Sequence, residues 1–436
     1  MRMEKSKKIK MVTFTPHPNF GTSLQSYALN YILKDMGHDV EFIYNNNDFL
    51  KRGAIGTIKD VIKKAIPQSM VEGYWKWKRV RRSRALPPTD LSQKEHTEAH
   101  IPPIIKDLPD SKIAFVLSKV PFFPWIVKLF KYRTTQWKKV YKFTYDDGNY
   151  KMRRIYTTKQ YEEVVDDADL FITGSDQIWN PYCCGFNPFM FLEFVKGRKK
   201  CISYSSSISR PSFPPEVEDR VKKDLEKFEH IAVREQKSVQ LLKQLLNRDD
   251  IKLVVDPTYL LPQEIWRTFG ERAKIEFTLP ERYIFCYFIG NRHNDYFEMV
   301  ETVKKETGIQ DVITIDCTQG KNNYGDGILY KDGGPYEFIY LLSHASFICM
   351  DSFHATIFAI KFRINFAHIL KTADDKSENS QNERMRDLFS RYNITYKLYN
   401  KGTDSWKKDI NWEYIERISE EEITNSLSYL ETAICE

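Results

Sequence analysis

The chain has 436 residues, a formal net charge of +7, 42% hydrophobic residues and 14% aromatic residues. This length exceeds what one ordinary hydrophobic core supports, so we expect two domains, and the hydrophobic content excludes a mainly disordered chain. No uninterrupted apolar run reaches the roughly 18 residues of a membrane span, and the N-terminal residues lack the apolar segment of a signal peptide.

The first predicted unit is a strand, a helix and a second strand. Residues 9–15 and 39–44 are apolar runs, and residues 24–37 between them follow helical spacing. This order favours a parallel sheet. The turn into the helix contains Asn19 and Gly21, and it offers backbone N–H groups that suit an anion. A plain connecting turn explains these residues equally well.

Residues 51–165 interrupt this alternation with a basic, aromatic section that is punctuated by proline. Residues 59–84 include nine basic residues and two acidic ones, Asp60 and Glu72. Residues 112–142 include eight basic residues and no acidic one. Such a regional charge indicates a local anionic partner. Interleaved Trp, Phe, Lys and Arg are typical of a segment on an anionic membrane surface, although an insertion that covers the core with snorkelling lysines is a slightly better explanation. No nucleic-acid-binding motif is present, so we expect no nucleic acid partner.

The remaining strands of the first domain are apolar runs that lead into polar residues, and they lie at 169–173, 200–207, 230–233 and 251–257. The first of them precedes Ser175, Asp176 and Gln177, and the third precedes Arg234. Because ligands in open α/β sheets bind outside the carboxyl ends of the strands, these residues are candidates for binding. Turn chemistry alone also accounts for a Ser and an Asp at such a position.

After a polar connection at 262–280, the alternation of strands and helices resumes. Strands are expected at 283–289, 312–316, 347–350 and 364–369, and helices at 294–306, 336–344, 383–392 and 419–430. We therefore predict an α/β protein with two Rossmann-like domains whose parallel sheets face a crevice. The N-terminal domain spans 1–265, with the insertion at about 51–165, and the C-terminal domain spans 280–436 and includes a C-terminal helix.

The stretch from 345 to 360 is the best single candidate for chemistry. Its apolar run stops abruptly at Asp351, Ser352, Phe353 and His354, and an apolar segment of helical length follows. A carboxylate, a hydroxyl and an imidazole at the carboxyl end of a strand lie where α/β proteins bind ligands.

Several common site motifs are missing from the sequence. There is no G-x-x-x-x-G-K-[ST], G-x-G-x-x-G, H-E-x-x-H or G-x-S-x-G, which disfavours nucleoside-triphosphatase, dinucleotide-binding and common hydrolase functions. The adjacent Cys183 and Cys184 have no second Cys or His pair at ligand spacing, so we expect no metal. Seven scattered cysteines, an odd number, favour reduced thiols in a cytoplasmic protein.

Six motifs occur in order, at 19–29 (N-F-G-T-S-L-Q-S-Y-A-L), 171–181 (F-I-T-G-S-D-Q-I-W-N-P), 202–207 (I-S-Y-S-S-S), 233–238 (V-R-E-Q-K-S), 255–261 (V-D-P-T-Y-L-L) and 351–360 (D-S-F-H-A-T-I-F-A-I). Together they resemble the polysaccharide pyruvyl transferase family. The resemblance implies a fold like that of the GT-B glycosyltransferases. It also implies transfer of pyruvate from phosphoenolpyruvate to a sugar of a surface polysaccharide or its lipid-linked precursor, with formation of a ketal and release of phosphate. No cofactor is implied besides this donor, and the place of action would be the cytoplasm, including the inner face of the membrane.

The resemblance also implies roles for individual residues. His354 matches the motif histidine and is the expected general acid, since imidazole titrates near neutral pH. Arg234 and Arg384 are expected to hold the anionic donor. The expected substrate-binding set is Arg234, Arg384, Asn19, Gly21, Ser175, Asp176, Gln177, Asp351 and Ser352, in which Asp176 and Asp351 act as bases or hold the acceptor hydroxyls. Many members carry Arg-Leu-His where this chain has Ser352, Phe353 and His354, so one donor-binding arginine is missing here.

Two other functions stay open at this point. One is a GT-B-type glycosyltransferase that uses a nucleotide sugar, although the sequence shows no clear set of base-stacking and ribose contacts. The other is a non-catalytic saccharide-binding scaffold at the membrane face. Ser352 in place of an arginine is consistent with this alternative, because it indicates a lost donor site.

Overall fold

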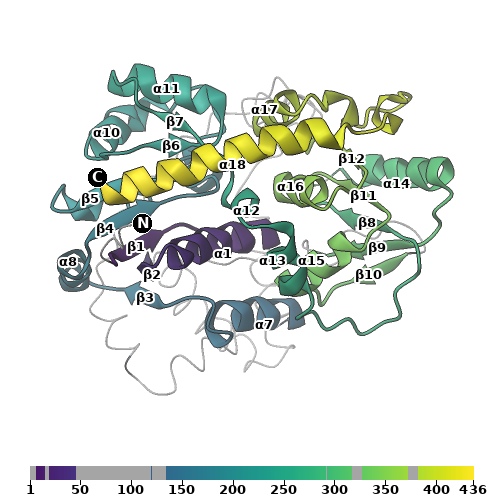
Figure 1. The fold of residues 1–436 in the computed structure, drawn as a ribbon, viewed down its shortest axis with the longest axis horizontal. Helices are drawn as coiled ribbons and strands as arrows, with labels where there is room; N and C mark the ends of the chain where they lie inside the picture. Colours follow the sequence, from purple (N-terminus) through teal and green to yellow (C-terminus); the bar gives the residue numbers. More distant parts are fainter. Residues whose placement is uncertain are drawn as a thin grey trace, which may run out of the picture.

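The structure is a computed structural model that describes residues 6–14, 19–45, 119, 134–290, 292–316, 327–371 and 382–436. Two five-stranded parallel sheets dominate it (Figure 1). The first has the order β3-β2-β1-β4-β5 and consists of β1 (Lys8–Val12), β2 (Asp39–Asn45), β3 (Met152–Ile155), β4 (Leu170–Thr173) and β5 (Lys200–Ser203). The second has the order β10-β9-β8-β11-β12 and consists of β8 (Ile284–Tyr287), β9 (Val312–Ile315), β10 (Ile328–Tyr330), β11 (Phe347–Met350) and β12 (Phe366–His368). The predicted class, two α/β units with parallel sheets, is confirmed.

Helices cover both sheets. In the N-terminal half they are α1 (Phe20–Asp35), α7 (Thr135–Tyr141), the π-helix Lys142–Asp146, α8 (Thr158–Asp167), α9 (Pro181–Cys184), the 3-10 helix Glu193–Val195, α10 (Pro215–Leu225) and α11 (Gln236–Leu246), with the short strands β6 (Ala232–Val233) and β7 (Lys252–Leu253) forming a small sheet. The remaining ones are α12 (Pro257–Leu260), α13 (Gln263–Gly270), α14 (His293–Thr307), α15 (Pro335–Ser343), α16 (Phe353–Lys361), α17 (Glu383–Arg391), the 3-10 helices Thr395–Lys397 and Ser405–Lys407, and α18 (Trp412–Cys435).

Helix α1 joins the two halves through an apolar contact. Its first residue, Phe20, stacks on Tyr287 at 6.0 Å between ring centroids and lies 5.5 Å from the ring of Phe338. One hydrophobic core therefore runs from the first sheet through α1 to the second. Because α1 is covered by the first sheet on one side and by the second half on the other, it is buried nearly all round and is rich in small residues such as Gly21 and Ser23.

The C-terminal helix α18 runs along both halves (Figure 1). Ser426 Oγ accepts a hydrogen bond from the backbone N–H of Val255 at 3.0 Å, and the hydroxyl of Tyr429 donates to the carbonyl of Ser203 at 2.8 Å. Lys7 Nζ donates to the carbonyl of Ile434. The last helix of the chain is thus packed on the N-terminal half.

Three local predictions differ from the structure. The strand expected at 251–257 comprises only Lys252–Leu253, because Asp256 and Pro257 begin helix α12, with Asp256 Oδ1 accepting from the backbone N–H of Thr258 at 3.1 Å. The connection at 262–280 contains α13, which buries Trp266 and Phe269 beneath a polar face. Strand β3 and helix α8 lie inside the stretch predicted as an insertion.

Most of that insertion lies outside the described residues, including all of 59–84 and most of 112–142. In its described part, Lys139 of α7 forms an ion pair with Glu337 at 2.9 Å and donates to the hydroxyl of Tyr330 at 2.9 Å. At least this lysine of the basic stretch is directed to the C-terminal half of the protein and not to an external surface.

Candidate active site

Each five-stranded sheet has one point where the strand order reverses. In the first sheet this point lies between β1 and β4, and in the second it lies between β8 and β11. Ligands of open α/β sheets bind outside the carboxyl ends of the strands at this point. Gly21 follows β1, Asp176 follows β4 and His354 follows β11. The topology therefore brings the predicted residues to the ligand-binding edges of both sheets.

His354 faces a carboxylate from the other half of the molecule. It lies in the first turn of α16 and is 4% exposed, and its Nε2 is 3.4 Å from Oδ2 of Asp256. The other oxygen, Oδ1, accepts a hydrogen bond from Thr258 Oγ1 at 2.7 Å. Burial acts to raise the pKa of Asp256, but His354 and Arg234 outweigh it and hold that pKa well below its usual range. Asp256 is thus an ionised partner for the imidazole.

Arg234 is the best-satisfied cation of the site. Its side chain is 2% exposed, and Nη1 donates to Asp256 Oδ2 at 2.7 Å. Nη2 lies 3.3 Å from Asp176 Oδ1, and Nε lies 3.3 Å from Glu235 Oε1. Burial acts to lower the pKa of Arg234, but the carboxylates around it raise that pKa overall. Every nitrogen of this guanidinium already has an acidic partner.

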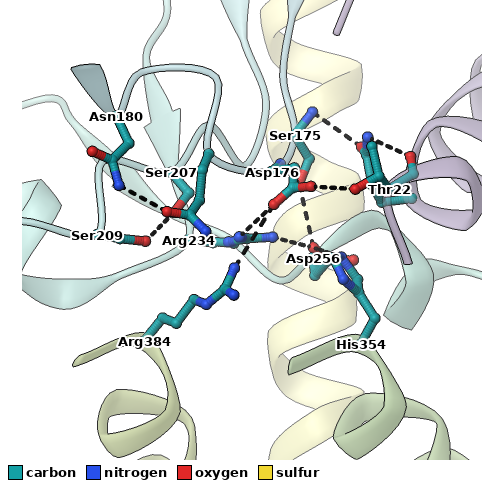
Figure 2. Close-up of polar contacts among 12 residues, drawn as sticks. Thr22, Ser175, Asp176, Asn180, Ser207, Ser209, Arg234, Asp256, His354 and Arg384 are labelled. Atoms are coloured by element: carbon teal, nitrogen blue, oxygen red, sulfur yellow. Dashed lines mark hydrogen bonds and ion pairs between the residues drawn. The ribbon is translucent and has the colours of Figure 1, made fainter. Parts of the chain in front are cut away.

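Arg384 approaches the carboxylate of Asp176 from helix α17, and it makes fewer polar contacts than Arg234 does. Its Nη1 lies 3.8 Å from Asp176 Oδ1, and its buried Nε has no hydrogen-bond partner among the residues that the structure describes. Burial and the nearby Arg234 lower the pKa of Arg384. The second oxygen of Asp176 accepts from Thr22 Oγ1 at 2.9 Å. Arg234, Arg384 and His354 converge on Asp176 and Asp256 from elements of both halves (Figure 2).

The pKa of Asp176 follows from this convergence. Burial acts to raise it, whereas Arg234, His354 and Arg384 lower it more strongly, so the net shift is downward. Asp176 is therefore an ionised carboxylate that accepts from Arg234, lies at ion-pair distance from Arg384, and does not have the raised pKa of a general acid.

Two glycines allow these groups to come together. A Cβ on Gly21 would lie 2.3 Å from His354 Nδ1, so only glycine lets α1 pass the imidazole. Gly174 has a φ of +130°, and a Cβ there would lie 1.9 Å from the carbonyl oxygen of Tyr204. The structure shows that the missing side chain of Gly21 makes room for His354, and the anion-binding role of its backbone stays a prediction.

Ser175 links Asp256 to the elements of the first sheet. Its hydroxyl lies 3.3 Å from Asp256 Oδ2, and its backbone N–H donates to Gln25 Oε1 at 3.3 Å. Its carbonyl accepts from Thr13 Oγ1 at 3.1 Å. These contacts fix the loop after β4 to β1 and α1, and so they fix the position of Asp176.

Two predicted residues of the 351–354 tip make structural contacts. The carboxylate of Asp351 accepts from the backbone N–H groups of residues 289 and 290 and from the hydroxyl of Tyr296, each at 2.7 Å. Ser352 is the N-cap of α16 and accepts from the N–H three residues later at 3.4 Å. The structure thus places Asp351 on the turn between β8 and α14, and it places Ser352 where it starts the helix that carries His354.

The two remaining predicted residues lie in the N-terminal half. Gln177 Oε1 accepts from Asn180 Nδ2 at 2.7 Å within the loop after β4. Asn19 is the N-cap residue of α1, and its carbonyl accepts from the N–H of Thr22 at 3.1 Å.

A small cavity lies beside the two arginines of the site. It is lined by residues of both halves, namely Arg234, Glu235, Val255, Asp256, Tyr259, Phe353, Arg384, Asp387, Leu388 and Arg391, and its volume is about 10 Å³. That volume suits about one water molecule.

Sequence reasoning missed Asp256, Glu235, Thr22 and Phe353. Asp256 stood in one of the six motifs and at the carboxyl end of a predicted strand, which was the available signal. Its pairing with His354 joins positions nearly a hundred residues apart, and no spacing rule reports such a contact.

The model of the polysaccharide pyruvyl transferase family matches residues 19–370, which is most of the chain. The chain belongs to this family. The family is a transferase family whose acceptors are saccharides, and the matched region includes Asp176, Arg234, Asp256 and His354 but not Arg384. A search of the curated proteins finds no significant match.

Solved structures similar to this transferase family member are distant. They include the Arabidopsis thaliana glycosyltransferase UGT89C1 complexed with UDP-L-rhamnose (10% identity, TM-score 0.47, covering 99% of this chain and 100% of that chain). Others are the glycosyltransferase SnogD from Streptomyces nogalater (12%, 0.40, 99% and 98%) and UDP-GlcNAc 2-epimerase from Methanocaldococcus jannaschii (10%, 0.43, 98% and 100%). No activity of these proteins is transferred to this chain.

No described helix combines the length and apolar character needed to cross a membrane. Within the same residues, no group of three or more His, Cys, Asp or Glu side chains is arranged to hold a metal ion.

Proposed function

We propose that this pyruvyl transferase family member uses phosphoenolpyruvate as its donor and forms a pyruvate ketal on a saccharide. One observation carries the proposal: a buried imidazole, two guanidinium groups and an ionised carboxylate from both halves converge at the reversal points of the two sheets. An acid beside an anion-binding pair is what chemistry on an anionic enol ester requires. Family membership supports the same reaction class.

In the proposed reaction, His354 delivers a proton to the methylene carbon of phosphoenolpyruvate, which becomes a methyl group. The adjacent carbon becomes an oxocarbenium-like centre, and one sugar hydroxyl adds to it with loss of its proton. Phosphate then leaves as its C–O bond breaks, and a second hydroxyl of the same sugar adds to the same carbon. One of the two hydroxyl protons replaces the proton given by His354, and the other leaves with the phosphate. Asp256 is the residue that holds the imidazole in place.

Arg384 is the better placed of the two arginines to hold the donor. Arg234 already has an acidic partner at each nitrogen, whereas Arg384 has a long contact with Asp176 and a buried Nε without a described partner. A phosphate or carboxylate group of the substrate would provide Arg384 with a close anionic partner and would accept a hydrogen bond from its Nε. Such charge-assisted hydrogen bonds to a guanidinium are strong. In this arrangement Arg234 fixes Asp256 and Asp176, and Arg384 binds substrate.

The acceptor is proposed to be a surface polysaccharide or its lipid-linked precursor, reached from the cytoplasm. The basic stretches at 59–84 and 112–142 remain a predicted contact with an anionic membrane surface. The family supports the saccharide acceptor, while the lipid link and the membrane contact rest on sequence pattern.

The test is phosphate release from phosphoenolpyruvate in the presence of hexoside acceptors, with mass spectrometry of the product. His354→Gln is expected to lower turnover about 10²- to 10⁴-fold, because it removes the general acid and keeps a polar side chain. His344→Gln, at the exposed end of α15, is the matched control and should keep wild-type turnover. Wild-type turnover in the His354 variant would refute its role as the acid.

Ligand-induced stabilisation separates this proposal from the glycosyltransferase alternative. Phosphoenolpyruvate at 100 times its dissociation constant stabilises the folded state by about 2.7 kcal/mol, which raises the melting temperature measurably. A UDP-sugar is expected to leave the melting temperature unchanged. A shift with the UDP-sugar and none with phosphoenolpyruvate would favour the glycosyltransferase, and no shift with either ligand would favour the scaffold.

A further inference from the structure

The ring of Phe353 contacts both arginines of the site. Phe353 is the first residue of α16 and is 7% exposed. The guanidinium carbon of Arg234 lies 4.5 Å from its ring centroid, and that of Arg384 lies 5.5 Å away. The ring also meets the imidazole of His354 edge to face, at 5.4 Å between centroids. One aromatic side chain therefore touches all three cationic or proton-carrying groups.

These contacts oppose a repulsion within the site. Arg234 and Arg384 are like charges that share a single oxygen of Asp176, and Arg234 lowers the pKa of Arg384. The negative face of an aromatic ring attracts a cation within about 6 Å, and the attraction is stronger where water is excluded. Among the described residues, the close contacts of Arg384 are the 3.8 Å contact to Asp176 and the ring of Phe353, so the ring is the main feature that keeps it beside Arg234.

We propose that Phe353 is a positioning residue that holds Arg384 beside Arg234, so that Arg384 can bind an anionic group of the substrate. This inference rests on the proposed function, in which that group belongs to phosphoenolpyruvate. The buried Nε of Arg384, which has no hydrogen-bond partner among the described residues, supplies an N–H for the anion. Both guanidinium groups pack on the same ring, which keeps two like charges close together that would otherwise move apart.

The test compares Phe353→Leu, which removes the ring, with Phe353→Tyr, which keeps it. Affinities for phosphoenolpyruvate and for inorganic phosphate are measured by isothermal titration calorimetry, and KM and kcat in the transfer assay. Phe353→Leu is expected to weaken both affinities and raise KM for phosphoenolpyruvate by about 5- to 30-fold, with a smaller change in kcat. Phe353→Tyr is expected to stay within about 3-fold of wild type.

The chain offers a matched control at the other end of the same helix. The ring of Phe362, the C-cap residue of α16, lies 5.3 Å from the guanidinium carbon of Arg267, which is outside the site. Phe362→Leu makes the same change to the same kind of contact, so it should lower the melting temperature as Phe353→Leu does and leave both affinities unchanged.

The outcomes distinguish this inference from the proposed function. Unchanged affinities in Phe353→Leu, or an equal loss in Phe353→Tyr, would overturn the role of the ring while leaving phosphoenolpyruvate as the donor. Wild-type protein that binds inorganic phosphate but not phosphoenolpyruvate would refute the proposed donor, and the phosphate affinities would then decide the role of Phe353.

Discussion

Replacement of Gly21 by alanine tests whether the position of His354 limits the reaction. The added Cβ would lie 2.3 Å from Nδ1, 2.5 Å from Cγ and 2.7 Å from Cβ of His354. Ordinary contact between such atoms begins near 3.4 Å, so the imidazole has to retreat by about 1 Å. It is buried between Phe353 and Asp256, so this retreat changes its distance to the carboxylate.

The expected effects on stability and on turnover differ in size. Overpacking of a buried site costs about 1–3 kcal/mol, and the better helix propensity of alanine offsets up to about 1 kcal/mol of this cost. The free energy of unfolding should therefore fall by roughly 0–2 kcal/mol. A displacement of about 1 Å at the reacting group lowers kcat about 10²-fold.

The assay combines urea unfolding with steady-state phosphate release. Gly270→Ala is the control, because Gly270 lies in helix α13 and an added Cβ there would meet Ile339 Cγ2 at 3.3 Å, a milder contact away from His354. That variant should lower the free energy of unfolding less than Gly21→Ala does, and it should keep kcat. If Gly21→Ala retained the wild-type kcat, the position of His354 next to α1 would not matter for the reaction, and the reasoning would be refuted.

Two further predictions concern stability. Gly174→Ala places a Cβ 1.9 Å from the carbonyl oxygen of Tyr204 at a φ of +130°, so it should cost more than about 3 kcal/mol, and wild-type thermal stability in this variant would contradict the loop geometry. His368 is fully buried, and burial, followed by Lys371 and Arg384, lowers its pKa to about 3. The folded protein keeps this imidazole neutral while the unfolded chain binds a proton below about pH 6.5, so the free energy of unfolding should fall by up to about 1.4 kcal/mol per pH unit between pH 6.5 and 3. His368→Asn should flatten that dependence in urea unfolding measured from pH 7 to 4; an unchanged slope would show that another group is responsible.

The sequence was sufficient for the elements that bury a continuous apolar face. Strands β4, β8, β9 and β11 lie within the predicted runs, because a parallel strand that is buried on both sides reads as a short apolar segment. Helix α13 was not predicted, since its buried face is only Trp266, Phe269 and Gly270 and the rest of the segment is polar. Strand β3 was missed for a similar reason: three of its four residues, 152–154, are only partly buried.

Sequence reasoning singled out residues that lie at the ends of strands, and it overlooked a residue whose contact depends on a distant partner. Asp176, Arg234 and His354 were found because each follows a strand at the carboxyl edge of a sheet. Asp351 was equally conspicuous, but its carboxylate is used by the turn after β8. Asp256 was overlooked because its pairing with His354 exists only after both sheets have formed and packed.

The position of α18 has a consequence for how the chain is made. Residues 426–434 cover the N-terminal half through Val255, Ser203 and Lys7, and the last of these contacts joins positions 427 residues apart in the sequence. A ribosome makes about 5–20 residues per second, so roughly 12 to 46 seconds pass between the synthesis of β5 and that of this covering segment. During synthesis its apolar surface under α18 is open to other chains, and contacts of such long separation form slowly. We therefore expect the nascent N-terminal half to be more prone to aggregation than the complete chain.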